Sequence, residues 1–437
     1  MIILPSWLIT SAKDKPLQNW GVRIVNNKID DVAPNAILIE RYPTEEKWDA
    51  NDQIVAPGFV DAHSHLYGVL AHGIPLVKVP AGFMPFLEEF WWPLVENRLD
   101  KEMICAATDY NCAEMIQGGI TSFYDCEEAP NALPGILAAQ AKIVKNRGLR
   151  GILSFEATQR INRENGQLGL KENLDFINAP TESENLVKGM MCFHTTFTCD
   201  SEFIKQAYSM AESTGSLVHS HCSEGGFEPL YALKNFGKRP IQYYDELGVL
   251  GDRSLLSQCV QIDPSEIDIL AKRNVRVTHM PLSNCEVGGG IAPIPDLEKA
   301  GVTIGLGSDG YITDFFEVMR GAFLIHKANR LDPQTMPASL VWYMATEGGA
   351  KAIGLENVGR LAVGWEADLQ MFNWDSPNPL EEHNLFDLTL LYCHQTNMTG
   401  VVVSGKVLMK NGILLGVDKS ELRRNTYQAC KRLWEHV

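Results

Sequence analysis

From residue 56 to residue 355, the chain alternates short apolar runs with longer stretches of helical spacing. The runs of strand length include Ile120–Tyr124, Gly151–Phe155, Met190–His194, Ser216–Cys222, Val275–Met280 and Val302–Gly307. The helical stretches include Glu102–Gln117, Ala132–Arg147, Ser201–Thr214, Asp263–Lys272 and Met336–Ile353. Strands that alternate with helices pair in parallel, because each helix carries the chain back to the edge where the previous strand began. Over about 300 residues this rhythm predicts an α/β fold, a (β/α)₈ or TIM barrel.

The two ends of the chain lack this rhythm. Residues 1–55 have the pattern of short strands, at Ile2–Thr10, Val22–Val25 and Ala36–Glu40. After residue 355, strand-like runs return at Leu361–Phe372 and Thr399–Lys410, and residues 419–435 have helical spacing. We expect residues 1–55 and 356–437 to form one small composite β-domain beside a barrel of residues 56–355, closed by the C-terminal helix.

The composition excludes several classes of partner. The 437 residues carry a formal net charge of −16, so nucleic acids and anionic membranes are poor partners. No uncharged apolar run reaches the roughly 18 residues that span a bilayer. The ten cysteines include no Cys-x-x-Cys pair. The apolar start Met1–Leu8 lacks a basic segment, so we interpret this start as a strand and not as a signal peptide. We therefore expect a cytoplasmic protein with free thiols.

Two histidines and an aspartate stand at the ends of apolar runs. His63 and His65 close the run that begins at Pro57, and Asp309 closes the run that begins at Gly305. Residues two apart on a strand project to the same face, so both imidazoles can reach one ion. Imidazole nitrogens with a carboxylate oxygen suit zinc or iron and suit calcium or magnesium poorly. We expect one divalent metal, zinc, with iron as the alternative.

A third histidine ends the run Ser216–Cys222. His219 and His221 share a face, so spacing alone does not decide which of them is a ligand. Glu224 follows three residues after His221, and a carboxylate near the metal can move protons during hydrolysis. This favours His221 as the ligand and Glu224 as a catalytic acid–base, against the alternative of a solvated loop glutamate. Asp309 has its own alternative, as the cap of a helix over Thr313–Leu324.

Other polar side chains follow the predicted strands. His194 ends the run Met190–His194 and can bind either metal or substrate. Arg160 follows Gly151–Phe155 as a loop cation that faces either the substrate or solvent. We interpret the aromatic stretch 86–92 as packing more readily than as a substrate lid.

These motifs, in this order, resemble the amidohydrolase superfamily over almost the whole chain. The matching segments are Pro57–His65, His194–Thr198, His221–Glu224, His279–Asn284, Gly290–Pro295, Gly307–Gly310, Gly359–Leu361, Gly364 and Ala367–Leu369. The resemblance is closest to the chlorohydrolase and aminohydrolase branch, with its cytosine, guanine and S-adenosylhomocysteine deaminases. Within that branch, the segments 90–92, 155–158 and 314–317 look most like SsnA-type aminohydrolases.

The resemblance implies a site and a reaction. His63, His65, His221 and Asp309 are expected to hold the metal, and Asp309 to accept a proton from the attacking water. Glu224 would protonate a ring nitrogen and then the leaving group. The substrate-binding residues implied are His194, Tyr67, Arg160 and His279. Some binuclear barrel hydrolases carry a carboxylated lysine at the fourth strand end; no Lys stands there, which favours one metal. Relatives of this kind are commonly homodimers that act on small molecules, and we expect the same here.

One segment departs from the family pattern. Where relatives carry a sixth-strand histidine pair, this chain has Gln258 and Gln261. An amide donates a hydrogen bond but does not shuttle a proton. The favoured reaction is hydrolytic deamination of an amino-substituted nitrogen heterocycle, such as a purine, pyrimidine, pterin or triazine, with Gln258 orienting the substrate. One alternative is ring opening of a cyclic amide, as in imidazolonepropionase-like members. Arg160 would favour this reaction by holding a substrate carboxylate. The other alternative is a catalytically silent metal-binding homologue.

Overall fold

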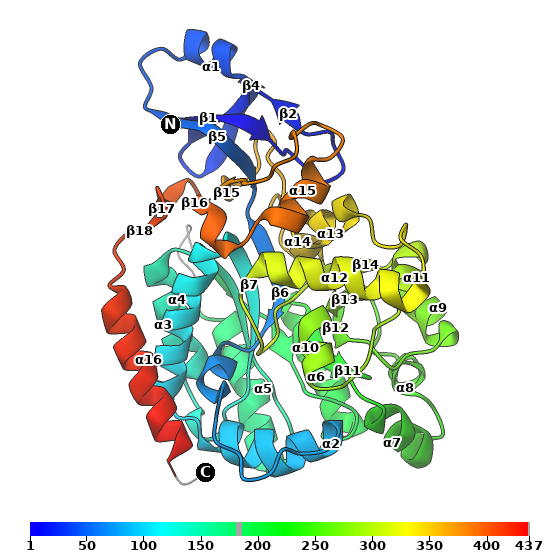
Figure 1. Ribbon diagram of the computed structural model, residues 1–437. Helices are drawn as coiled ribbons and strands as arrows, with labels where there is room; N and C mark the ends of the chain where they lie inside the picture. The colour runs from blue at the N-terminus through cyan, green and yellow to red at the C-terminus, as the bar shows by residue number, and fades with distance from the viewer. Residues whose placement is uncertain (181–185, 436–437) are drawn as a thin grey trace.

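The computed structural model describes residues 1–180 and 186–435, and Figure 1 shows a small β-rich part above a larger α/β part. Both ends of the chain contribute to one sheet of nine strands. Its strands are β1 (Ile2–Leu8), β2 (Leu17–Gln18), β3 (Trp20–Val25), β4 (Lys28–Pro34), β5 (Lys47–Pro57), β15 (Leu369–Asn373), β16 (Met398–Val403), β17 (Lys406–Lys410) and β18 (Ile413–Leu414). The two ends meet where β5 pairs in parallel with β1 and antiparallel with β15, with Val55 opposite Met371.

One predicted strand is wrong. Residues 36–40 lie in the helix α1 (Asn35–Arg41), and not in a strand. Only Leu38 of this helix is buried, where it packs with Ile2 and Leu4, while Ile37 and Ile39 are partly exposed. A short apolar run has no clear period, so its sequence alone does not separate helix from strand.

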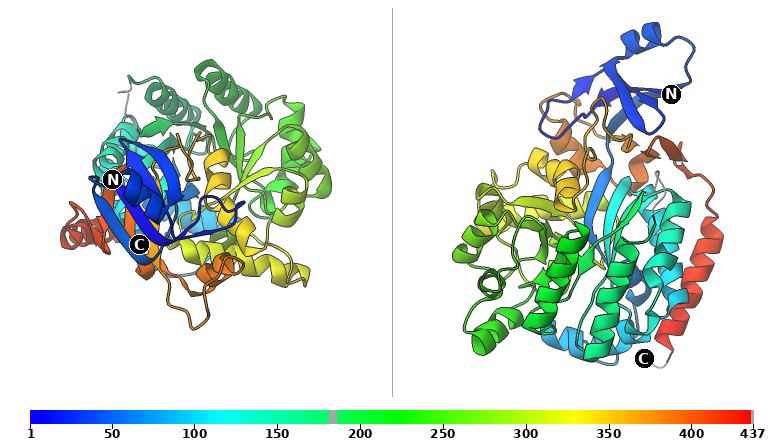
Figure 2. Two further views of the ribbon diagram at one scale, coloured as in Figure 1. Left: turned by 90° about the horizontal axis from the view of Figure 1, so that it is seen from above. Right: turned by 180° about the vertical axis from the view of Figure 1, so that it is seen from behind.

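The larger part contains two sheets of parallel strands. One has the order β6 (Phe59–Ser64), β7 (Ile120–Glu127), β8 (Arg150–Phe155), β9 (Val187–Gly189), and the other β10 (Met191–Cys192), β11 (Val218–Cys222), β12 (Ser254–Gln258), β13 (Arg276–His279), β14 (Thr303–Leu306). Single bridges link the two sheets at both sides, Ser64 with Asp309 and Ala157 with Phe193. Figure 2 shows the strands surrounded by helices.

The surrounding helices mostly follow the predicted positions. They are α3 (Lys101–Gln117), α4 (Ile136–Arg147), α5 (Arg163–Ile177), α6 (Ser201–Thr214), α7 (Phe227–Phe236), α8 (Pro240–Glu246), α9 (Pro264–Lys272), α10 (Pro281–Glu286), α11 (Ile294–Lys299), α12 (Phe315–Arg330), α13 (Ala338–Met344), α14 (Glu347–Ala352), α15 (Leu385–Tyr392) and α16 (Lys419–Trp434). Aspartate caps fix several starts: Asp200 accepts from the N–H of Phe203 before α6, and Asp263 caps α9. The helix predicted over residues 336–353 is broken at Thr346 into α13 and α14.

Two short helices follow β6 and cover the carboxyl end of the strands. They are η1 (Leu66–Ala71) and η2 (Phe86–Val95), a π-helix preceded by the short turn α2 (Phe83–Pro85). Because β6 begins directly after β5, its carboxyl end points away from the nine-stranded sheet (Figure 1). The parallel strands therefore deliver their terminal side chains to the rim that η2 covers. Within residues 1–180 and 186–435, no helix has the length and apolarity needed to cross a membrane.

Candidate metal centre and active-site cavity

The end of β6 places two imidazoles side by side. His63 is fully buried, and neither of its ring nitrogens has a hydrogen-bond partner. Nδ1 of His65 lies 2.5 Å from the carbonyl oxygen of Cys126, so Nδ1 carries the proton and donates it. The lone pair of His65 is therefore on Nε2, which faces the strand ends. This is the tautomer that a metal ligand needs, fixed by the backbone of the next strand.

Strand β11 adds the third imidazole. Nε2 of His221 lies 3.3 Å from Nε2 of His65, and ring nitrogens of His63, His65 and His221 all lie within 4.8 Å of one another. His219 lies outside this group of three, and its Nδ1 lies 3.3 Å from the Cys192 thiol. The geometry thus favours His221 over His219, the choice that spacing left open.

Asp309 closes the group from the end of β14. Its carboxylate lies 3.8 Å from Nε2 of His65 and 3.9 Å from Nε2 of His63. The backbone at Asp309 is left-handed, with φ of 61°, and its N–H donates to the carbonyl of His63 at 2.9 Å. Close approach of the two strands requires Gly307, where a Cβ would stand 2.7 Å from that same carbonyl oxygen. The conformation that aims Asp309 at the histidines is thereby fixed by pairing with β6.

Asp61 on β6 also binds the residue that precedes Asp309. It is fully buried and accepts hydrogen bonds from the backbone N–H of Ser308 at 2.9 Å and from its hydroxyl at 2.5 Å. Burial raises the pKa of Asp61 to about 7, although both hydrogen bonds from Ser308 oppose this. The pair holds the residue before Asp309 against β6.

Sequence reasoning missed the buried carboxylate of Glu156. Glu156, at the end of β8, is 2% exposed and lies between two histidines. Its Oε2 is 3.4 Å from Nδ1 of His221, and its Oε1 is 3.3 Å from Nε2 of His194. Burial, and then the charge of Glu128, raise the pKa of Glu156 well above its usual range. A polar residue directly after a buried strand was the signal that could have found it.

Glu224 and Gln258 line the cavity next to Asp309. Burial, followed by the charge of Asp309, raises the pKa of Glu224 well above its usual range. Gln258 ends β12 with a left-handed backbone, φ of 75°, and its Nε2 donates to Oδ2 of Asp309 at 2.7 Å. A carboxylate accepts only, so the amide nitrogen must face Asp309. The amide oxygen of Gln258 is buried without a partner. Gln261 lies outside the cavity wall and donates to the carbonyl of Gly289.

The four residues expected to bind substrate have different positions. His194 lines the cavity, with Nδ1 2.9 Å from the Thr198 hydroxyl, and burial lowers its pKa to about 3. Tyr67 also lines it, but its hydroxyl donates to Glu96 at 3.0 Å.

Arg160 and His279 do not line the cavity. The guanidinium of Arg160 is bound by the carboxylates of Glu96 and Glu128. Nε2 of His279 lies 3.0 Å from Nε2 of His326 on α12. The structure thus separates these two residues from the other expected substrate contacts.

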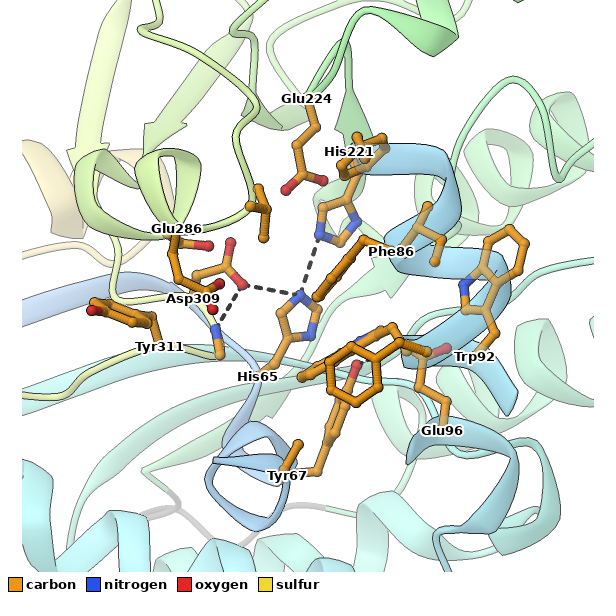
Figure 3. A pocket seen from close by; sticks show the side chains of 18 of the residues that line it. His65, Tyr67, Phe86, Trp92, Glu96, His221, Glu224, Glu286, Asp309 and Tyr311 are labelled. Atoms are coloured by element: carbon orange, nitrogen blue, oxygen red, sulfur yellow. Dashed lines mark hydrogen bonds and ion pairs between the residues drawn. The ribbon is translucent and has the colours of Figure 1, made fainter. Parts of the chain in front are cut away.

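The cavity above these residues has a volume of about 420 Å³. Figure 3 shows Phe86 and Trp92 on one side and Tyr311 with Glu286 on the other, around His65, His221 and Asp309. Its aromatic lining residues are Tyr67, Phe83, Phe86, Phe90, Trp91, Trp92 and Tyr311. The stretch 86–92, interpreted from sequence as packing, therefore also forms a wall of the cavity.

The residues fit a divalent metal. His63 is fully buried, and neither of its ring nitrogens has a hydrogen-bond partner. The Nε2 atoms of His65 and His221 face each other, and neither has another hydrogen-bond partner. Lone pairs turned toward one another in a buried site repel unless a cation lies among them. Three imidazoles with the carboxylate of Asp309 form the nitrogen and oxygen donor set that zinc prefers.

Comparison with known proteins gives a consistent assignment. The sequence profile of the amidohydrolase family matches residues 54–408. A 5-methylthioadenosine/S-adenosylhomocysteine deaminase of Pelotomaculum thermopropionicum is 31% identical, over 98% of this chain and 96% of the relative. A 5'-deoxyadenosine deaminase of Methanosarcina barkeri is 30% identical, over 100% of this chain and 99% of the relative. An adenosine deaminase of Xanthomonas campestris, solved with bound zinc, superposes with a TM-score of 0.88 at 23% identity, covering 99% of this chain and 98% of the other. Since the family match includes every strand that carries the histidine and aspartate cluster, the chain belongs to the amidohydrolase family.

Proposed function

We propose that the protein is a hydrolytic deaminase of an amino-substituted nitrogen heterocycle that uses one divalent metal, zinc. His63, His65, His221 and Asp309 would hold the metal. The observation that carries the proposal is the convergence of three buried imidazoles and this carboxylate at the floor of an aromatic cavity. The two relatives described above are deaminases of adenosine derivatives, and the structural neighbour contains zinc.

Each reacting group has a position suited to its role. A divalent metal bound here supplies Lewis-acid activation of water. Asp309 accepts a proton from the attacking water, with its carboxylate held in place by Gln258 and by the N–H of Gly310. Burial raises the pKa of Glu224 well above its usual range, which favours the protonated form that can protonate a ring nitrogen and later the departing amine.

The remaining wall residues orient the heterocycle. Aromatic rings such as Phe86 and Trp92 offer flat faces to a planar ring. The buried oxygen of Gln258 is an acceptor, which suits an amino group that donates N–H. A cyclic amide would present its carbonyl acceptor at the reacting carbon, so the orientation of this amide favours deamination over ring opening.

The position of Arg160 also weakens the ring-opening alternative. That reaction would be favoured if Arg160 held a substrate carboxylate, but Glu96 and Glu128 already bind its guanidinium. A silent homologue is disfavoured because the ligand set keeps mutually supporting contacts, such as the Cys126 carbonyl on His65.

We also propose that the parallel strands form one closed eight-stranded barrel, in which β9 and β10 are two pieces of the fourth strand. The bridges Ser64–Asp309 and Ala157–Phe193 support closure on both sides. The barrel would comprise residues 56–355, and residues 1–55 with 356–437 would form the composite β-domain. The pairing of β5 with β1 and β15 supports this division.

The direct test is turnover of the zinc-reconstituted protein. Aminopurines, aminopyrimidines, pterins, aminotriazines, adenosine derivatives and cyclic ureides are supplied separately, and ammonia release is measured beside ring opening by chromatography. We expect ammonia from at least one aminated heterocycle. The variant carrying His63→Ala with His65→Ala should contain no zinc and release none, while His383→Ala, exposed and remote from the cavity, should match the wild type. Ring opening of a ureide without deamination of any heterocycle would refute the proposal.

A further inference from the structure

Carboxyl groups surround the proposed active-site cavity. Five acidic side chains line it: Glu96, Glu156, Glu224, Glu286 and Asp309. No lysine or arginine is among its lining residues, all of which belong to the part of the chain that the structure describes. Figure 3 shows Glu286 beside Asp309, Glu224 near His221, and Glu96 on the side of Trp92. Acidic side chains therefore face a bound molecule from several directions.

The buried cation Arg160 is already paired with carboxylates. Arg160 lies behind the wall, with its guanidinium 5.2 Å from the ring of Trp92. It donates to Oε2 of Glu96 at 2.8 Å, to the amide of Asn97 at 2.8 Å, and to Glu128. Two carboxylates bind this one guanidinium, so Arg160 is not available as a partner for a substrate anion.

The side-chain amide of Gln258 offers the cavity a hydrogen-bond acceptor. Gln258 is fully buried and lines the cavity, and its Oε1 has no hydrogen-bond partner because Asp309 takes the amide N–H. The polar contacts that Gln258 and the free carboxylates offer are thus acceptors.

From these three observations we propose that the site selects neutral or cationic aminated heterocycles and rejects substrates that carry a carboxylate or phosphate. The inference rests on the proposed deaminase function and specifies its substrate class. Glu224 favours its protonated form and Glu96 is bound to Arg160, so Glu286 at the rim is the carboxyl group that a substituent on the heterocycle would meet. An anionic substituent on the heterocycle would lose its hydration beside Glu286 and meet no lysine or arginine that could pair with it, which is the costly arrangement for a buried charge.

The rim residue Glu286 is the most suitable position to test. It ends α10 at the solvent-exposed mouth of the cavity, so its replacement does not disturb the core.

The test compares probes that differ mainly in charge. Adenine and guanine carrying a propyl, an aminopropyl or a carboxyethyl group at ring nitrogen N9 are presented to the zinc-loaded enzyme. Ammonia release gives kcat/KM, and titration calorimetry gives affinity. For the base that is deaminated, we expect the carboxyethyl probe to be worse than the propyl probe by about 100-fold, and the aminopropyl probe to equal or exceed the propyl probe. A carboxyethyl probe as good as the propyl probe would overturn the inference.

Variants connect the preference to the cavity. Glu286→Gln should narrow the gap between carboxyethyl and propyl probes by several fold, and Glu286→Lys by about tenfold or more. Glu212→Lys, on the exposed face of α6 and outside the cavity, should leave it unchanged. If no probe releases ammonia but affinity still follows charge in this order, the deaminase proposal fails and the charge preference stands. The charge preference fails if ammonia is released at rates that do not depend on the charge of the probe. It also fails if the ratio between the propyl and carboxyethyl probes is the same in Glu286→Lys as in the wild type.

Discussion

The side-chain amide of Gln258 donates a hydrogen bond of 2.7 Å to Oδ2 of Asp309. Gln258 stands where the family pattern has a sixth-strand histidine, and it contacts a proposed metal ligand. The backbone is left-handed at Gln258 and at Cys259, where β12 ends, and the side chain of Gln258 reaches Asp309 after β14. The sequence suggested that the amide donates to substrate, but in the structure its donor is occupied by Asp309 and its acceptor is free.

Replacing Gln258 tests this contact. Gln258→Leu removes the donor without adding charge, and a hydrogen bond to a charged group contributes about 1.5–3 kcal/mol. We expect kcat to fall by roughly 10- to 100-fold with zinc content unchanged, since the histidines remain. Gln258→His should add to the pH–rate profile a limb that the wild type lacks. An unchanged kcat in Gln258→Leu would show that the contact is not used.

Glu224 is expected to act on protons and not on the metal. Glu224→Gln keeps the shape of the side chain and its hydrogen bonding but removes the acid–base group. The rate should fall by about 10²- to 10⁴-fold, the contribution typical of a positioned acid or base. Zinc measured by elemental analysis should stay at about one per chain; loss of zinc in step with activity would make Glu224 a ligand.

Glu156 is expected to orient His221. Its carboxylate lies 3.4 Å from the Nδ1 of that imidazole, on the side opposite the proposed metal. Such supporting carboxylates usually contribute 10- to 100-fold to metal affinity, and we expect Glu156→Gln to weaken zinc binding by about that factor. Competition with a chromophoric chelator measures it. Glu172→Gln changes another buried glutamate, which binds backbone N–H groups at the start of α4, and it should keep the wild-type affinity.

The sequence predicted the parts of the structure that depend on local pattern. Strand ends that carry His63, His221 and Asp309 follow clear apolar runs, and aspartate caps such as Asp200 mark where helices start. The strand β12 was not found from its apolar pattern, because two serines and a glutamine interrupt it.

The contacts of buried charges could not be predicted in the same way. Arg160 has the sequence context of a loop cation, and only the packing of η2 brings Glu96 to it. Glu156 and His279 likewise depend on which side chains face them from neighbouring elements, information that a single strand does not contain.

The buried pair His279 and His326 makes stability depend on pH. Their Nε2 atoms are 3.0 Å apart, so one donates and the other accepts, and both rings are neutral. Burial, followed by the charge of Arg330, lowers the pKa of His326 to about 4. An unfolded histidine has a pKa of about 6.5, so between about pH 6.5 and pH 4 the unfolded chain binds a proton that the folded chain does not. The free energy of unfolding therefore falls as the pH decreases through this window, and the full stability is retained above it.

His326→Gln removes this titration while keeping a side chain that can hydrogen-bond to His279. Lowering the pH from about 7.5 to about 5 should cost the wild type roughly 2 kcal/mol more than the variant. Urea denaturation of the metal-free proteins at both pH values measures the difference, so that acid release of zinc does not contribute. His383→Gln changes an exposed histidine and should follow the wild type at both pH values. Equal losses in the wild type and in His326→Gln would show that the folded protein binds the proton at this pair as readily as the unfolded chain does.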